Sequence, residues 1–255
     1  MTKAIHIKNI MIGKGLPKIC VPIMGTTLEQ LREDVKAVSQ AAPDVVEWRA
    51  DYFEALDDFY AVKEAGRMIQ EELKEYPLIF TVRTVPQGGK AEIDPKEYTK
   101  LLKMAAVAQL ADIIDVEILE QEVLKKDLID FLHEHNIKAI GSFHDFTDTP
   151  PKKDMYKILQ KADAAGADIL KLAVMPKTLF DVWELLEVTN STTVEHTEKP
   201  IVTIAMGDLG SLSRFSGEIF GSALTFATID KQSAPGQLPI EELREMMNLF
   251  HKNTD

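Results

Sequence analysis

Eight short apolar runs, each followed by a stretch of helical periodicity, most constrain what this chain can fold into. The runs lie at residues 20–24, 45–49, 78–83, 113–117, 138–144, 169–174, 201–206 and 224–228. Their first residues are 23 to 35 positions apart. Short strands that alternate with helices at this spacing are typical of βα units and a parallel sheet. The sequence therefore predicts an α/β fold.

The length and continuity of the chain favour a closed barrel over an open sheet. The chain has 255 residues, which is roughly the length that a (β/α)₈ barrel requires. No linker-like stretch, internal repeat or shift in composition divides it. We therefore predict a single (β/α)₈ TIM-barrel domain over residues 1–255. The weakly alternating residues 5–12 predict an N-terminal β-hairpin that closes the bottom of the barrel.

Capping residues locate the starts of two helices. Residues 26–29 read Thr-Thr-Leu-Glu, the pattern of a capping box that begins at Thr26. Asp94 followed by Pro95 combines a good N-cap with proline at the first helical position. One helix is thus predicted over residues 28–42, and another is predicted to begin at residue 95.

The charge balance and the cysteine content argue against several kinds of partner and compartment. The 29 basic and 41 acidic side chains give a net charge of −12. A diffuse acidic surface repels phosphate backbones and anionic lipid, so neither nucleic acid nor a membrane is expected as a partner. The only cysteine, Cys20, has no disulfide partner, and no run approaches the length of a membrane span. We therefore expect a soluble, cytoplasmic protein.

Charged side chains interrupt the predicted strands at or near their carboxyl ends, although strands buried on both faces are usually almost entirely apolar. These side chains are Glu47, Arg49, Arg83, Asp115, Glu117, His144, Lys171 and, after the seventh strand, Arg214. In a barrel, the catalytic groups lie at this end of the strands. Each charge taken singly is more often a solvated strand end or a structural ion pair, so the pattern predicts a site only when it is taken as a whole.

Lys171 stands out because it lies in the middle of the apolar run Ile-Leu-Lys-Leu-Ala-Val. A buried ammonium costs several kcal/mol unless it is paired or neutral. Arg49, Arg83 and Arg214 in the same cavity would favour the neutral amine, and a Schiff-base nucleophile requires that form. His144 is the only histidine at a predicted strand end. Lys171 and His144 are therefore the candidate nucleophile and base.

Other motifs predict neither a metal nor a nucleotide. His133 and His135 lie two positions apart on a predicted helix, so they cannot face one metal together. The sequence contains no Gly-x-Gly-x-x-Gly or Walker pattern. The glycine-containing segments 87–89 and 233–237 follow the third and eighth strands, and we expect them to form flexible loops at the catalytic face.

Seven segments, which follow one another along almost the whole chain, resemble a known family. They read VEWRAD (46–51), FTVR (80–83), DVE (115–117), SFHDF (142–146), KLAVMP (171–176), SRFSGEIFGSA (213–223) and SAPGQ (233–237). Together they resemble type I 3-dehydroquinate dehydratase. The resemblance implies a (β/α)₈ barrel, commonly a homodimer, that acts in the shikimate route to chorismate and aromatic amino acids. It implies an enzyme that needs neither a metal nor a cofactor.

The resemblance also implies roles for the candidate residues. Lys171 would form an imine with the C3 ketone of 3-dehydroquinate. His144 would remove the C2 proton and then protonate the departing C1 hydroxyl, which gives 3-dehydroshikimate by syn elimination of water. The implied substrate-binding residues are Glu47, Trp48, Arg49, Arg83, Arg214, Ser233 and Gln237, with the last three on the substrate carboxylate.

Three residues depart from the pattern of the family. Gln87, in the loop after Arg83, stands where the family usually has a glutamate close to the catalytic histidine. Pro22 stands where many relatives have a serine that contacts the substrate, and Leu170 replaces a proline before Lys171. Because the lysine, the histidine and the arginine are all present, we expect these changes to affect the rate and the pH dependence rather than the type of reaction.

The residues taken without the resemblance leave two other functions open. A class I aldolase on the same barrel also needs a lysine on the sixth strand, and the three arginines could bind a phosphate as well as a carboxylate. A barrel that only binds a partner, without catalysis, would carry a lysine that titrates normally and forms no adduct with ketones.

Overall fold

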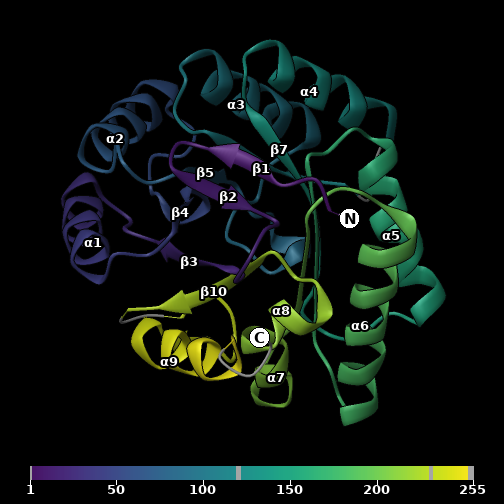
Figure 1. The fold of residues 1–255 in the computed structure, drawn as a ribbon. Coiled ribbons are helices and arrows are strands. Elements are labelled where there is room, and N and C mark those ends of the chain that lie inside the picture. The colour runs from purple at the N-terminus through teal and green to yellow at the C-terminus, as the bar shows by residue number, and fades with distance from the viewer. Residues whose placement is uncertain (1, 119–121, 230–231, 252–255) are drawn as a thin grey trace.

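A curled parallel β-sheet, ringed by helices, forms the centre of the structure (Figure 1). The computed structural model describes residues 2–118, 122–229 and 232–251. In chain order, the strands of the barrel are β3 (Lys18–Ile23), β4 (Val45–Arg49), β5 (Leu78–Thr81), β6 (Ile113–Glu117), β7 (Lys138–Asp145), β8 (Ile169–Val174), β9 (Ile201–Ala205) and β10 (Leu224–Thr228). From β3 to β9, each strand pairs in parallel with the next, and β10 pairs in parallel with β3. The predicted barrel is confirmed.

The barrel closes between β9 and β10 with less regular pairing than elsewhere. The ladder there is reduced to a parallel bridge between Ile201 and Ser222. The backbone N–H of Ala223 donates to the carbonyl of Ile201 at 2.7 Å. A short additional strand, β11 (Leu238–Pro239), pairs with β10. The last strands of the sheet therefore lie beside its first strand, β3.

Helices cover the outside of the sheet. They are α1 (Leu28–Ala41), α2 (Phe59–Glu72), α3 (Pro95–Val107), α4 (Glu122–Glu134), α5 (Lys152–Ala164), α6 (Leu179–Ser191), α7 (Ser211–Phe215), α8 (Gly217–Phe220) and α9 (Ile240–His251). One apolar cluster, which includes residues from Ile19 to Met247, fills the layer between the sheet and these helices.

The observed boundaries of the strands and helices agree closely with those predicted from the sequence. Four of the apolar runs (45–49, 113–117, 169–174 and 224–228) coincide with strands, and the other four differ from strands by at most two residues at either end. Asp94 caps α3 as predicted, since its side chain accepts from the N–H groups of Lys96 and Glu97. The capping box at Thr26 was wrong, because Thr27 is the N-cap of α1 and accepts from the N–H of Gln30. The helix itself begins at Leu28 as predicted, and it buries Leu31, Val35 and Val38.

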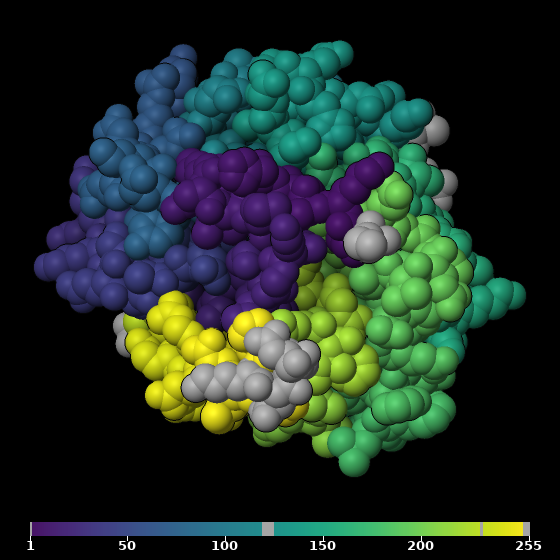
Figure 2. Space-filling view, in the orientation of Figure 1, coloured from purple at the N-terminus to yellow at the C-terminus, as the bar shows by residue number. Residues whose placement is uncertain are grey.

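The predicted N-terminal hairpin is also confirmed. Strands β1 (Ile5–Ile7) and β2 (Ile10–Ile12) pair antiparallel. Ile7 and Ile12 are buried in a cluster with the first inward-facing residues of the barrel strands, among them Val45, Ile113 and Ile169. Figure 2 shows this purple segment over the middle of one face of the molecule. The hairpin closes the end of the barrel at which the strands begin.

The alternation of side chains along the strands places the charges inside the barrel. On β8, Ile169 belongs to the bottom layer of the interior, Lys171 lies two residues further along, and Leu170 and Leu172 face the helices. The same alternation puts Val45 below Glu47 on β4. Successive side chains point to opposite faces of a strand, so inward-facing residues are two positions apart. The interior of the barrel therefore has an apolar layer near the start of the strands and a polar layer two residues further along.

None of the helices in the described part of the chain is both long enough and apolar enough to cross a membrane. The cytoplasmic location and the single domain over residues 1–255 stay predictions.

Candidate active site

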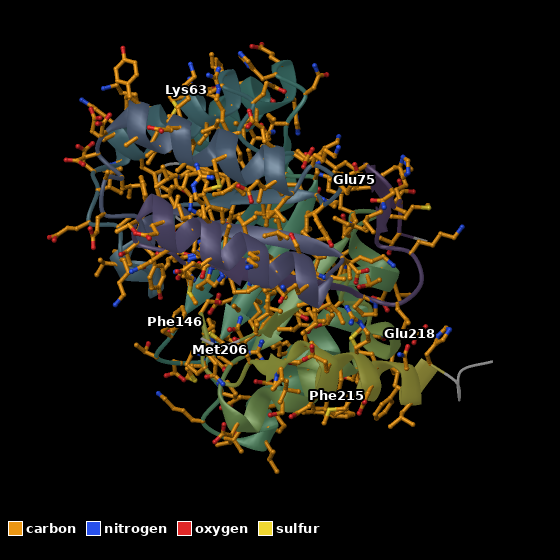
Figure 3. The ribbon with its side chains drawn as sticks, turned by 90° about the vertical axis from the view of Figure 1, so that its left-hand side faces the viewer. Lys63, Glu75, Phe146, Met206, Phe215 and Glu218 are labelled. Atoms are coloured by element: carbon orange, nitrogen blue, oxygen red, sulfur yellow. The ribbon has the colours of Figure 1, made fainter. Side chains whose placement is uncertain are left out.

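A cavity opens at the carboxyl ends of the strands. The charged residues that line it are Glu47, Arg49, Arg83, His144, Lys171 and Arg214, and Ser233 and Gln237 line it from the segment between β10 and β11. Apolar side chains complete the wall, among them Phe146 and Met206, which lie close together in Figure 3. The structure thus brings together charged side chains from β4, β7 and β8, from the segment just after β5, and from the short helix α7.

The amine of Lys171 lies between two carboxylates at the base of this cavity. Its Nζ is 3.5 Å from Oδ2 of Asp115, to which it donates, and 3.6 Å from Oε1 of Glu47. The same nitrogen lies 4.4 Å from the ring centroid of Phe226. The sequence argument weighs only the arginines around Lys171, whereas in the structure two carboxylates also lie beside its nitrogen.

His144 is a buried imidazole held through its backbone. Its N–H donates to Oε1 of Gln87 at 2.9 Å, and the ring stacks on Phe146 with centroids 6.5 Å apart. Among the described residues, Nδ1 has no hydrogen-bond partner. Burial lowers the pKa of His144 well below its ordinary value, and the positive charges of Arg83, Lys171 and Arg49 lower it further. The imidazole is therefore neutral at neutral pH.

Arg83 is held by two carboxylates on β6. Its guanidinium forms ion pairs with Asp115 at 2.8 Å and with Glu117 at 3.0 Å, and it donates to Oγ of Ser142 at 3.0 Å. Thr84 fixes Glu117 by donating to both of its carboxylate oxygens. Burial alone would lower the pKa of Arg83, but the two carboxylates raise it above its ordinary value. Arg83 is therefore a permanent cation.

Arg49 is oriented by a carboxylate two residues further along the chain. Its Nε and one terminal nitrogen donate to the two oxygens of Asp51, both at 2.8 Å. Oδ2 of Asp51 also accepts from the backbone N–H of Lys90 at 3.1 Å. A two-pronged contact of this kind fixes the plane of the guanidinium, so Arg49 enters the cavity with its charge already compensated.

Arg214 differs from the other two arginines because no carboxylate in the described residues lies within ion-pair distance. It is buried, and its terminal nitrogens donate to the carbonyls of Phe226 at 3.4 Å and Pro235 at 2.7 Å. Its Nε has no hydrogen-bond partner in the described residues. Burial lowers the pKa of Arg214 to about 10, which still leaves the side chain charged at neutral pH. The cavity therefore contains one buried cation that is not compensated.

The segment 233–237 is tied together and to Arg214. The N–H of Ser233 donates to Oε1 of Gln237 at 2.7 Å, and Nε2 of Gln237 donates to Oγ of Ser233 at 2.9 Å. The hydrogen bond from Arg214 to Pro235 joins this segment to α7. Ser233 and Gln237 therefore reach the cavity on the same side as the uncompensated cation.

Two of the predicted site residues lie elsewhere than in the cavity wall. Trp48 faces the helices, where its ring packs edge-on against Phe53 and Phe80. The predicted substrate contact for Trp48 is therefore wrong: alternation sends residue 48 outward whenever Glu47 and Arg49 point inward. Gln87 is buried and is not part of the cavity lining; its side-chain Oε1 accepts from the backbone N–H of His144.

Sequence reasoning missed the residues that support the charged ones. Asp115 was recognised as a charge near a strand end but was given no role, and Ser142, which donates to it, was not considered. The aromatic residues Phe146 and Phe226 were also missed. Each lies two residues after an inward-facing position, so the alternation could have located them. Of the departures from the family pattern, Leu170 lies on the helix side of β8, away from the cavity.

Comparison with known proteins identifies a family for this site. A family model described as type I 3-dehydroquinase matches residues 19–254. A 3-dehydroquinate dehydratase from Clostridium novyi is 42% identical over 249 residues, which cover 98% of this chain and 98% of that protein. A crystal structure of the type I enzyme from Clostridium difficile with covalent modified comenic acid is 40% identical, with a TM-score of 0.95 over 99% of this chain and 100% of that one. A crystal structure of the 3-dehydroquinate dehydratase from Geobacillus kaustophilus is 34% identical, with a TM-score of 0.96 over 99% of this chain and 98% of that one.

These matches span almost the full length of this chain and of each relative. The chain belongs to the type I 3-dehydroquinase family. It is accordingly a hydro-lyase of the shikimate pathway that acts through a Schiff base. Membership in the 3-dehydroquinase family decides against the two functions that the residues alone left open, a class I aldolase and a barrel without catalysis.

Gln87 gives a direct test of the electrostatics around His144. A carboxylate at position 87 would stabilise the imidazolium, so we expect Gln87→Glu to raise the pKa of His144 by about one unit. Gln87→Ala removes the acceptor of the His144 N–H without adding a charge, and it should not raise this pKa. An NMR pH titration of the imidazole measures both variants. Equal midpoints in the two variants would show that charge at position 87 does not reach the ring.

Proposed function

We propose that Lys171 forms the Schiff base of this reaction and that His144 transfers the protons. The substrate implied by the family is 3-dehydroquinate. The observation that carries the proposal is the meeting, in one cavity, of an amine, a neutral imidazole and an uncompensated arginine. An amine can condense with a ketone, a neutral imidazole can accept a proton, and a free guanidinium can bind a carboxylate.

Lys171 is the amine best placed for imine formation, since no other lysine in the described ranges lines the cavity. Its lone pair would attack the C3 carbonyl carbon after the ammonium has lost a proton. Loss of water from the resulting carbinolamine gives the iminium. The positive nitrogen then withdraws electrons and makes the proton on the neighbouring C2 more acidic.

His144 is suited to act first as a base and then as an acid. Because burial and nearby cations lower its pKa, the imidazole is free to accept the C2 proton at neutral pH. The imidazolium formed in this way can return the proton to the departing C1 hydroxyl. Use of one group for both transfers requires that they occur on one face of the ring, which agrees with a syn elimination.

Arg214 is proposed to bind the substrate carboxylate, with Ser233 and Gln237 beside it. Arg49 and Arg83 already have carboxylate partners, so an incoming anion gains most from the guanidinium that has none. The remaining polar groups of the wall, Glu47, Arg49 and Arg83, are left to bind the hydroxyl groups of the ring. Their fixed positions would set the orientation of C2 toward His144.

We also propose a homodimer, as the resemblance to the family implies. The first turns of α6 carry Leu179, Phe180 and Trp183, which are largely exposed. Leu209, on a 3₁₀ turn that contacts α6, is also exposed. Contiguous apolar surface of this kind is typical of protein interfaces, and a second copy of the chain would cover it.

The role of Lys171 is tested by reduction with borohydride in the presence of 3-dehydroquinate, followed by intact mass and peptide mapping. We expect one adduct, on the peptide that contains Lys171, and none in Lys171→Ala. Lys177→Ala is the matched control, because Lys177 follows the same strand but is exposed and paired with Asp148; it should retain the adduct. An adduct on a different lysine would rule out the assignment.

The role of Arg214 predicts a large loss of kcat/KM when the side chain is removed. Loss of one partner from a buried charged contact typically costs about 2–5 kcal/mol, or roughly 30- to 4,000-fold. Arg214→Lys keeps the charge but loses the forked geometry, so it should be impaired as well. Steady-state kinetics measure both variants. A value for Arg214→Ala within about threefold of the parent would mean that another group orients the substrate.

The proposed interface on α6 predicts that Trp183→Glu weakens the dimer, since it would bury a charge between the two copies. Tyr60→Glu is the matched control, because Tyr60 is an exposed aromatic residue on α2. Sedimentation equilibrium gives the mass of each variant. We expect a dimer for the parent and Tyr60→Glu, and dissociation for Trp183→Glu. Equal association in both variants would place the interface elsewhere.

A further inference from the structure

Three neighbouring strands place a buried carboxylate directly against the amine of Lys171. Asp115 lies on β6, Ser142 on β7 and Lys171 on β8, and Ser142 is the register partner of Lys171. Oδ2 of Asp115 accepts from Nζ of Lys171 at 3.5 Å. Both side chains are at least nine-tenths buried. The contact therefore lies in the interior of the barrel, where water screens it little.

Asp115 is held firmly in its ionised form. Arg83 pairs with its Oδ2 at 2.8 Å, and the hydroxyl of Ser142 donates to its Oδ1 at 2.5 Å. Burial alone would raise the pKa of Asp115, but Arg83, Lys171 and the hydrogen bond from Ser142 outweigh burial and lower it below the ordinary value. Asp115 is therefore a fixed negative charge rather than a group that exchanges protons during the reaction.

The second carboxylate near Lys171 is less well placed to accept from the nitrogen. Oε1 of Glu47 lies 3.6 Å from Nζ of Lys171, just beyond hydrogen-bond distance. The described donor to that oxygen is the hydroxyl of Thr81. An ammonium has three N–H donors and can serve several acceptors. An iminium on the same nitrogen has only one, so one acceptor must be preferred.

We propose that Asp115 is the catalytic counter-ion of the iminium and accepts its single N–H. This inference rests on the proposed role of Lys171 and adds a residue to it. Its basis is the hydrogen bond between Asp115 and Lys171, together with the fixed position that Arg83 and Ser142 give to the carboxylate.

The chemistry of the reaction shows when a counter-ion is needed. The ammonium and the ketone give the iminium and one water, so the three N–H protons become one N–H and two protons of water, and the positive charge is conserved. Removal of the C2 proton by His144 then moves an electron pair toward nitrogen and gives a neutral enamine. Only a protonated imine can accept this pair well. A fixed anion beside the nitrogen keeps that proton in place.

Asp115 is one of several ionisable groups that face Lys171. Among the described residues, the others include Cys20 on β3, Glu47 on β4, Arg83 after β5 and His144 on β7, and the cations Arg49 and Arg214 line the same cavity. A test must therefore distinguish the effect of removing the charge of Asp115 from the effect of any other change in the electrostatics of this group of residues. Glu117 provides the control, because it also pairs with Arg83 but has no contact with Lys171 among the described residues.

The test is the pH dependence of trapping by cyanoborohydride, which reduces a protonated iminium in preference to a neutral imine. The protein, equilibrated with saturating 3-dehydroquinate, is treated over roughly pH 6 to 10, a range in which exposed amines and imines change protonation. Intact mass gives the rate of covalent fixation. For Asp115→Asn, we expect the fall in this rate at high pH to begin about one unit lower than in the parent.

Glu117→Gln is expected to raise KM, because Arg83 loses a partner, but to leave the pH at which trapping falls unchanged. A shift in Glu117→Gln equal to that in Asp115→Asn would mean that the effect acts through Arg83, and it would overturn the proposal. So would a profile for Asp115→Asn that superimposes on that of the parent. Failure of the parent itself to be trapped at Lys171 would instead contradict the proposed function, so the two failures are distinguishable.

Ser142→Ala is a second variant that keeps the charge of Asp115. It removes the hydroxyl that fixes the carboxylate, so we expect a shift in the same direction that is smaller than in Asp115→Asn, by roughly a factor of two to three in the trapping rate at high pH. If Asp115→Asn does not fold, this variant decides the matter. Trapping in Ser142→Ala that is identical to the parent would then overturn the proposal.

Discussion

The carboxylate of Asp115 joins Arg83 to Lys171, and the rest of the site depends on that shared charge. Two cations whose nitrogens lie within 3.5 Å of one oxygen would repel each other strongly inside a barrel without it. Glu117 and Asp51 pair with the charges of Arg83 and Arg49. Arg214 alone among these cations keeps a buried charge with no described carboxylate partner. The cavity is therefore prepared for one negative group, as expected of a family whose substrate is a carboxylate.

The barrel produces this charge distribution by a simple alternation. Every second residue of a strand points inward, so an apolar floor that includes Val45, Ile113 and Ile169 is followed two residues later by Glu47, Asp115 and Lys171. The N-terminal hairpin covers the floor and keeps water from that end. The polar layer lines the cavity at the carboxyl ends of the strands, where the catalytic groups of barrels lie.

Much of the fold could be predicted because the spacing of apolar residues along the sequence differs between strands and helices. The runs at 45–49 and 169–174 coincide with strands, and Asp94 caps the helix that it was expected to cap. The pairing of side chains could not be predicted in this way. Asp115 and Lys171 lie on strands separated by β7, and only the curvature of the sheet shows that their side chains meet. Trp48 was misplaced because the neighbouring residues Glu47 and Arg49 are functional candidates, although alternation points it outward.

A crystal structure of the protein after borohydride reduction with 3-dehydroquinate tests the central claim most directly. The claim is that paired charges hold Lys171 in place and leave Arg214 to bind the carboxylate. The account predicts a covalent bond from Nζ of Lys171 to C3 of the ligand, the carboxylate on the guanidinium of Arg214, and the ring of His144 facing C2. A ligand whose carboxylate lies on Arg49 or Arg83, with Arg214 still bound only to backbone carbonyls, would contradict it.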